Sequence, residues 1–416
     1  MPRTLGGTVH VVGAGLAGLA AAVRLASRGM KVVVHEAAGQ AGGRCRSYHD
    51  PALDMVIDNG NHLLLSSNHA ALSYLATIGA ADTLAGPPEA EFAFMDLAAG
   101  ERWTLRINAG LLPWWIFDAR RRVPGTKAGD YLAFARLLYA SEKKTICETV
   151  RCKGALYDRL ARPLWVAALN TDPKEASAAL AGAIIRETLA KGGRACRPLI
   201  ARNGLGAVFI APALRFLGEH RVEVRFGHRL RALARVEREV TALDFGEDKI
   251  VIGEGDGVIL AVPPVAAADL VPNLSTPSEF RAIVNAHFRL APPAALAPIT
   301  GVVNGTVEWL FSFPDRLSVT ISAADRLLDA PRESLAQQIW DEVATIARLP
   351  KALPPWQIVR ERRATFAATP AENAKRPPAQ TAWRNLFLAG DWTRTGLPAT
   401  IEGAIRSGHR AADLVG

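Results

Sequence analysis

The pattern of apolar and polar positions opens with a strand, a turn and a helix. Val9, Val11 and Val12 form an apolar run that leads into a glycine-rich segment, and an Ala- and Leu-rich segment follows over residues 19–27. A second apolar run over residues 31–34 predicts the next strand and ends at Glu36. Two strands joined by a glycine turn and a helix are typical of a dinucleotide-binding unit.

Farther along, the same pattern predicts a second region of strands, a helical region and a return to the first sheet. Residues 91–105 alternate in short apolar and polar steps, which favours strands. Residues 130–191 are rich in Leu, Ala and Arg and predict helices. Residues 221–226 and 256–264 predict two more strands of the first sheet, the second of them stopped by prolines. Beyond these, residues 270–378 predict further strands and one helix over residues 335–348.

The glycine turn carries the first candidate chemistry. Glycines allow the backbone to approach a pyrophosphate, and the helix N-terminus that follows faces its negative charge. Glu36 stands close to the spacing at which a carboxylate binds a ribose hydroxyl, which indicates an adenosine without a 2′-phosphate. NAD and FAD both use this turn, so the segment leaves these two cofactors open.

Two further segments bear on that choice. Gly42-Gly43-Arg44 follows the acidic strand end, and Leu388-Ala389-Gly390-Asp391-Trp392 stands near the C-terminus. Together with the first turn they resemble the flavin amine oxidase and carotenoid desaturase superfamily. The resemblance implies an extended FAD, with its adenosine end at the first turn and Asp391 at the ribityl and pyrophosphate end.

The same resemblance extends the FAD site to other segments. It implies that residues 55–62 run beneath the flavin and that the backbone near Leu230 contacts the adenine. It also directs the amides and positive dipole end of the last helix, expected from Pro398 to Leu414, at the pyrimidine edge of the flavin. An ordinary proline-started helix is the alternative for this end. The predicted FAD-binding residues are Gly13, Gly15, Leu16, Ala17, Gly18, Glu36, Gly42, Gly43, Arg44, Asn59, Gly60, Leu230, Gly390, Asp391, Pro398, Ala399 and Thr400.

Three segments narrow the resemblance. Residues 167–171, 301–311 and 389–404 are similar to the hydroxysqualene dehydroxylases, the desaturase-like flavoproteins of hopanoid biosynthesis. Membership implies FAD-dependent removal of the allylic hydroxyl from a linear C30 alcohol, giving squalene and water. The alternative is a carotenoid- or phytoene-type desaturase or isomerase that acts on a long isoprenoid. One departure from the family pattern is Glu308, where we expect a glutamine.

The implied reaction has physical demands that select candidate residues. Hydroxide is a poor leaving group, so a general acid must protonate it, and His62 and Glu308 are the candidates, with Asp58 behind them. The allylic cation left behind is best held by aromatic faces, and hydride comes from reduced FAD. The candidate aromatic walls are Trp165, Trp309 and Trp392, although packing in the core is an equal alternative for each.

Composition and charge exclude several classes of protein. Hydrophobic residues make up 49% of the 416 and charged residues 21%, which argues against disorder. The four cysteines, Cys45, Cys147, Cys152 and Cys196, have no metal-ligand spacing, and we expect reduced thiols in a cytoplasmic protein. No signal peptide, membrane-spanning run, metal site or second glycine turn for NAD(P)H is apparent in the sequence, so we expect an external electron donor.

A net charge of +9 raises the question of an acidic partner. The basic residues are spread, except Arg120-Arg121-Arg122, which follows the apolar run Leu111 to Phe117 with its two tryptophans. Aromatics beside arginines suit the boundary between acyl chains and anionic headgroups, and a buried loop is the alternative. Because a C30 hydrocarbon has almost no aqueous solubility, we expect peripheral contact with the inner face of the cell membrane and no nucleic acid partner.

These observations predict an α/β protein of the amine oxidase and phytoene desaturase type. A chain of 416 residues exceeds what one core usually supports. We expect a discontinuous Rossmann-type FAD domain, an α+β substrate domain and a helical insertion. Their predicted ranges are 1–80, 195–268 and 380–416 for FAD, 81–110 and 269–379 for substrate, and 111–194 for the helical, membrane-contacting subdomain.

Overall fold

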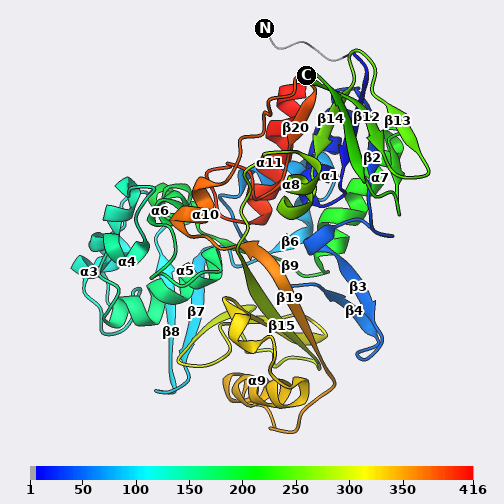
Figure 1. Ribbon diagram of the computed structural model, residues 1–416. Coiled ribbons are helices and arrows are strands. Elements are labelled where there is room, and N and C mark those ends of the chain that lie inside the picture. Colours follow the sequence, from blue (N-terminus) through cyan, green and yellow to red (C-terminus); the bar gives the residue numbers. More distant parts are fainter. Residues whose placement is uncertain (1–5, 416) are drawn as a thin grey trace.

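A computed structural model describes residues 6–415 and contains two large sheets beside a group of helices (Figure 1). The first is a five-stranded parallel sheet of order β10-β2-β1-β14-β20. Its strands are β1 (Thr8–Val12), β2 (Lys31–His35), β10 (Glu223–Arg225), β14 (Gly257–Leu260) and β20 (Leu386–Leu388). This arrangement confirms the predicted Rossmann-type fold, with strands from distant parts of the chain in one sheet.

Apolar side chains alternate between the two faces of this sheet. Val9 and Ile259 pack against helices α1 (Leu16–Ala26), α7 (Ala211–Glu219) and α11 (Ile401–Val415). Val258 and Leu260 face the opposite way, toward the antiparallel meander β11 (Ala232–Val236), β12 (Glu239–Asp244) and β13 (Lys249–Val251). Residues buried on both faces explain why these strands are almost continuously apolar.

Helices α1 and α11 hold the beginning and the end of the chain together. A β-carbon at Gly408 of α11 would overlap the carbonyl oxygen of Ala17 in α1, so the two helices approach at backbone distance. The guanidinium of Arg24 donates to the carboxylate of Asp413 at 2.7 Å and adds an ion pair at the rim. Figure 1 shows the blue and red helices side by side at the top of the view.

The second sheet has seven strands in the order β19-β15-β18-β17-β16-β7-β8. Helix α9 (Arg332–Ala347) covers one face (Figure 1). Its Trp340 packs there against Phe288 at a ring distance of 5.0 Å. On the other face, Trp309, Thr320 and Asn285 stand in one cross-strand row. The strands are β7 (Ala90–Asp96), β8 (Glu101–Ile107), β15 (Phe280–Arg289), β16 (Ile299–Val303), β17 (Trp309–Ser312), β18 (Arg316–Ile321) and β19 (Trp356–Phe366).

Smaller elements connect the two sheets. Two are β-structures: the hairpin β3 (Ser47–Asp50) and β4 (Met55–Asp58), and the three-stranded sheet of β5 (Leu63–Leu65), β9 (Pro198–Ala201) and β6 (Leu84–Ala85). The helical group contains α3 (Ala128–Leu132), α4 (Ile146–Thr149), α5 (Arg162–Leu169) and α6 (Ala178–Glu187). Three short helices complete the fold: α2 (His69–Thr77), α8 (Pro264–Leu270) and α10 (Pro370–Ala374). Within residues 6–415, no helix combines the length and apolarity needed to cross a membrane.

Two sequence predictions need correction. The last helix begins at Ile401 rather than Pro398, because the Thr400 hydroxyl accepts a hydrogen bond from the Gly403 amide and caps the helix there. The four cysteines are not all reduced, since Cys147 and Cys152 form a disulfide and only Cys45 and Cys196 are free. Helix α4 ends within one turn, so the chain folds back and brings the two Cα atoms to 5.2 Å.

Candidate functional site

The glycine turn between β1 and α1 is built to leave one side open. Gly13 has φ +107°, and a β-carbon there would overlap the Ala261 carbonyl, so the turn requires glycine. Gly18 is equally tight, because its β-carbon would overlap the carbonyl oxygen of Gly13. A β-carbon at Gly15, in contrast, meets no atom of residues 6–415 within 4 Å. The open side of the turn therefore lies at Gly15, where α1 begins.

Helix α1 begins at the open side of the glycine turn. The first turn, with Leu16, Ala17 and Gly18, contains no acidic residue, and no side chain caps it from Gly15. Its unpaired amides and positive dipole end suit a diphosphate. The arrangement of an open backbone and an uncapped helix fits the dinucleotide that the sequence predicts.

Glu36 lies at the carboxyl end of β2, beside this turn. Its carboxylate accepts hydrogen bonds from the amides of Ala14 at 2.6 Å and Ala38 at 2.8 Å. The segment that leads to the buried Leu230 is fixed to the same place, because the His228 amide donates to the Glu36 carbonyl. The structure thus brings the predicted ribose and adenine contacts to one edge of the sheet.

Arg44 joins the two distant segments that carry the sequence signal. The Gly42 amide donates to the Ala14 carbonyl, which places the second glycine pair against the first turn. From there the Arg44 guanidinium reaches both carboxylate oxygens of Asp391, each at 2.7 Å. Asp391 is buried, so its charge needs this partner. Early and late segments therefore form one site.

Arg376, which the sequence analysis missed, secures the late segment. It is 1% exposed, and its guanidinium donates to the carbonyls of Asp391 and Thr393 and to the Thr395 hydroxyl. Its pKa falls to about 10 because burial disfavours the charged form. Apart from Asn373, which accepts at 3.0 Å, the hydrogen-bond partners of its side chain lie 15 to 19 residues farther along the chain, so no local pattern around residue 376 marks it.

Pro398, Ala399 and Thr400 form the approach to α11 in this late segment. Gly390 adopts φ +151°, and its amide donates to the Ser407 hydroxyl of α11 at 2.8 Å. The strand end, the loop and the last helix are thereby tied together beside Asp391. These residues fit the role of holding the far end of an extended dinucleotide.

The predicted flavin-floor turn lies against the open face of the second sheet. Asn285 donates its side-chain amide to the Asn59 carbonyl at 3.3 Å. Gly60 leaves room for this amide, whose nitrogen lies 3.1 Å from the position that a β-carbon of residue 60 would take. Asn61 donates to the Thr320 hydroxyl at 3.1 Å. These contacts hold the turn that carries Asn59, Gly60 and His62 against the second sheet.

His62 is half-buried at this turn. Burial, together with the positive charge of Arg44, lowers the pKa of His62 to about 4. Its imidazole is therefore neutral at neutral pH. A neutral imidazole is a poor source of the proton that a leaving hydroxide needs.

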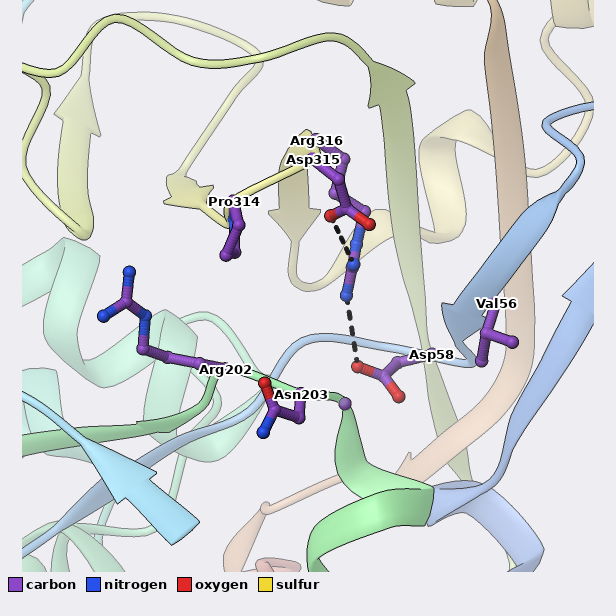
Figure 2. Close-up of a pocket in the computed structure, with 8 residues that line it drawn as sticks. Val56, Asp58, Arg202, Asn203, Pro314, Asp315 and Arg316 are labelled. Atoms are coloured by element: carbon purple, nitrogen blue, oxygen red, sulfur yellow. Dashed lines mark hydrogen bonds and ion pairs between the residues drawn. The ribbon is translucent and has the colours of Figure 1, made fainter.

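Asp58 lines a pocket of about 410 Å³ between β4, the loop after β9 and the turn before β18. Figure 2 shows Arg316 reaching Asp58 from above, while the side chain of Arg202 lies to the left and points away from Asp58. The Asp58 carboxylate accepts from the Ser47 hydroxyl at 2.5 Å and the Leu205 amide at 2.8 Å, and lies 3.7 Å from Arg316. These contacts give Asp58 a structural role, tying three segments together.

Glu308 stands at the turn between β16 and β17. Its carboxylate accepts from the Ser322 amide at 2.7 Å. Burial raises the pKa of Glu308 to about 7, although the Ser322 hydrogen bond, Arg326 and Arg162 act in the opposite direction. Burial therefore favours the protonated form of Glu308 compared with an exposed glutamate. Burial also raises the pKa of Asp58, although Ser47, Leu205 and Arg316 act in the opposite direction, so Glu308 and Asp58 are the two predicted acids whose protonated forms burial favours.

The three candidate tryptophans fall into two groups. Trp165 and Trp309 are 7% and 4% exposed, and their indole Nε1 atoms have no hydrogen-bond partner within residues 6–415. Trp392 is also buried, but its Nε1 donates to the Val262 carbonyl at 3.0 Å. Burial and this hydrogen bond thus explain Trp392 as a core residue, whereas the indole N–H groups of Trp165 and Trp309 have no acceptor within residues 6–415.

Segment 111–122 is divided between the surface and the core. Leu112, Trp114 and Phe117 are 78%, 53% and 68% exposed, whereas Trp115 is only 5% exposed. The Trp115 ring packs edge-on against Tyr131 at 5.1 Å. The expectation that both tryptophans face a membrane is therefore wrong for Trp115, because neighbouring residues of a short 3₁₀ turn point in different directions.

Comparison with known proteins places this arrangement among flavoproteins. Residues 16–416 match the family described as "Flavin containing amine oxidoreductase". A hydroxysqualene dehydroxylase from Rhodopseudomonas palustris is 62% identical over 409 residues, which cover 98% of both chains. One from Sinorhizobium fredii is 56% identical over 406 residues, covering 98% of this chain and 97% of the other. The solved structure of cyclohexylamine oxidase from Brevibacterium oxydans shares the fold, with a TM-score of 0.70 at 17% identity over 99% of this chain and 98% of that one.

Proposed function

The chain belongs to the flavin containing amine oxidoreductases and, within them, to the hydroxysqualene dehydroxylases, and on this basis we propose that it reduces hydroxysqualene to squalene. The observation that carries the proposal is the near end-to-end identity to two enzymes of that name. The cofactor is FAD, held by the glycine turn, Glu36, Gly42 to Arg44 and the Asp391 segment. When bound and reduced, it supplies the hydride that replaces the hydroxyl.

The residues of the chain handle the proton and the cation. Glu308 protonates the allylic hydroxyl, the C–O bond breaks, and the oxygen leaves as water. The indole faces of Trp309 and Trp165 stabilise the positive charge on the carbon without trapping it. A neutral His62 suits this environment, since a second cation beside Arg44 would repel the developing charge.

Anaerobic single turnover tests this function. Photoreduced enzyme is mixed with hydroxysqualene in detergent, and squalene and oxidised flavin are measured together. We expect one squalene for each flavin that is reoxidised. Flavin that stays reduced with no squalene would refute the dehydroxylase assignment. Consumption of phytoene by the oxidised enzyme, with reduction of its flavin, would favour a desaturase instead.

Replacement of Glu308 tests the proton donor. Glu308→Gln should slow squalene formation by roughly 10²- to 10⁴-fold and leave flavin content unchanged, because the amide cannot donate a proton. Glu175→Gln is the matched control, since Glu175 is an exposed carboxylate whose partner is Arg281. Turnover by Glu308→Gln at the rate of wild type would place the acid elsewhere.

We also propose that the protein takes its substrate from the membrane. Leu111, Leu112, Trp114 and Phe117 form an exposed apolar group next to Arg120, whose side chain is 89% exposed. Apolar and aromatic anchors beside cations suit an anionic bilayer surface, where each Arg adds roughly 1 kcal/mol. An external reductase supplies electrons to the flavin.

Vesicle sedimentation tests the membrane contact. Leu112→Ser/Trp114→Ser/Phe117→Ser should bind vesicles of phosphatidylglycerol at least tenfold more weakly, with an unchanged flavin spectrum. Val236→Ser/Val251→Ser removes two exposed apolar side chains from the distant meander and serves as the control. If the triple variant sediments as well as the wild type, this group is not the docking surface.

A further inference from the structure

Two consecutive amides at the end of β18 organise the surroundings of Glu308. The Ser322 amide donates to the Glu308 carboxylate at 2.7 Å, and the next amide, that of Ala323, donates to the Asn170 side-chain oxygen at 2.6 Å. Ala323 adopts φ +44°, an uncommon conformation for alanine. A carboxylate and a side-chain carbonyl thus bind adjacent amides of one strained turn.

Asn170 is built into the fold more firmly than its partner. It ends helix α5 in a left-handed conformation, φ +50°, and is 2% exposed. Its side-chain NH₂ donates to the Arg281 carbonyl at 3.1 Å and to the Thr365 hydroxyl at 3.0 Å. The nitrogen of its side chain therefore bonds to β15 and β19, and the oxygen of its side chain bonds to the Ala323 turn. An amide is needed here, because only an amide can both donate to two acceptors and accept from a backbone N–H.

We propose that Asn170 is a positioning residue for Glu308, which it fixes by holding the Ser322–Ala323 turn in the conformation that binds the Glu308 carboxylate. The inference rests on the proposed function, since it assigns a purpose to Asn170 only if Glu308 is the proton donor. Asn170 lies in residues 167–171 and Glu308 in residues 301–311, so the proposal connects two of the segments that resemble the hydroxysqualene dehydroxylases.

The charges near Glu308 give this positioning a measurable consequence. Arg162 on α5 and Arg326 after β18 both favour the ionised form of Glu308, and so does the Ser322 amide. Burial acts against these groups and raises the pKa of Glu308 to about 7. Movement of the Ser322–Ala323 turn, or a new negative charge beside it, therefore changes the pKa of Glu308. Because Glu308 must be protonated to act, activity falls as pH rises through its pKa.

The test is the pH dependence of single-turnover squalene formation in holoenzyme variants. Asn170→Asp keeps the size and the acceptor oxygen but adds a negative charge next to the turn and removes the two donors. The alkaline limb should move upward by roughly half a pH unit or more, because a like charge disfavours ionisation of Glu308. Flavin content and KM should stay unchanged. Asn385→Asp is the matched control, since Asn385 is a buried amide that binds Val240 in the distant meander.

Two further variants separate the possible outcomes. Thr365→Val removes one acceptor of Asn170 and leaves both Asn170 and Glu308 in place, so it applies if Asn170→Asp does not fold; we expect a lower kcat with unchanged KM. For Asn170→Asp, a pH limb that stays at its wild-type position would overturn the positioning role, and for Thr365→Val a wild-type kcat would do so. Glu308→Gln identifies a different failure: if it retains the wild-type limb, the assignment of the acid is wrong, and not the geometry of the turn.

Discussion

The substitution Gly15→Ala should separate cofactor binding from folding. Gly15 precedes α1 with φ −72° and ψ 176°, an extended conformation that alanine adopts without strain. An added methyl meets no atom of residues 6–415 within 4 Å. The same substitution at Gly18 must displace the carbonyl of Gly13. The two variants therefore place one methyl on opposite sides of the same turn.

The expected magnitudes follow from these surroundings. For Gly15→Ala, the loss of a favourable N-cap residue costs roughly 1 kcal/mol and the stiffer unfolded chain returns about 0.4–1 kcal/mol, so the free energy of unfolding of the apoprotein changes little. Flavin binding should suffer far more, because the methyl holds the diphosphate away from the helix amides. One lost hydrogen bond to a charged group is worth about 1.5–3 kcal/mol, which raises Kd by roughly 10- to 100-fold.

The assay combines two titrations of each variant. Urea unfolding of apoprotein gives stability, and quenching of flavin fluorescence gives Kd. Gly18→Ala should lose about 1–3 kcal/mol of stability through overpacking. A Gly15→Ala protein that binds FAD within twofold of wild type would refute the location of the diphosphate at this turn.

Three more predictions follow from contacts that the structure defines. Arg44→Met should weaken flavin binding and lower thermal stability, because it leaves the buried Asp391 carboxylate without its partner; differential scanning fluorimetry with and without FAD measures both effects. Under denaturing, non-reducing conditions two of the four cysteines should react with a thiol reagent, and a count of four would show that Cys147 and Cys152 are reduced. Gly408→Val should destabilise the protein by at least 2 kcal/mol in urea, roughly the cost of forcing two packed helices apart, and wild-type stability would contradict the close contact with α1.

The parts that the sequence predicts correctly are those with local signals. The apolar runs before Gly13 and Glu36 lie in β1 and β2, and the Ala-rich segment between them forms α1. Gly13 adopts a φ of +107°, which glycine tolerates far better than other residues, so the glycines after the first strand indicate this turn from residue types alone. Pairing between the early and late segments was inferred from resemblance, and the Arg44–Asp391 ion pair joins them.

Features that depend on distant contacts could not be predicted in this way. The apolar run from Leu111 to Phe117 does not disclose that Trp114 is exposed and Trp115 buried, because Asn108 fixes the turn by accepting from the Trp115 amide. The sequence around Arg376 gives no signal for the same reason, because Asp391 and Thr395, to which its guanidinium donates, belong to another segment. The disulfide also depends on α4 ending after only four residues, and the sequence of this short helix does not specify where it ends.

Glu308 illustrates why catalytic chemistry is harder to infer than fold. A glutamate in the sequence carries an ordinary pKa near 4.3, so it would be ionised and useless as an acid at neutral pH. What changes its chemistry is burial, and the Ser322 amide that binds its carboxylate belongs to a turn that Asn170 also holds through Ala323. The role that we propose for Glu308 thus depends on three segments that meet, residues 167–171, 301–311 and the end of β18. A glutamine at position 308 could accept the same hydrogen bond from Ser322 but could carry no proton, so Glu308→Gln separates the proposed acid from the hydrogen bond that holds the turn.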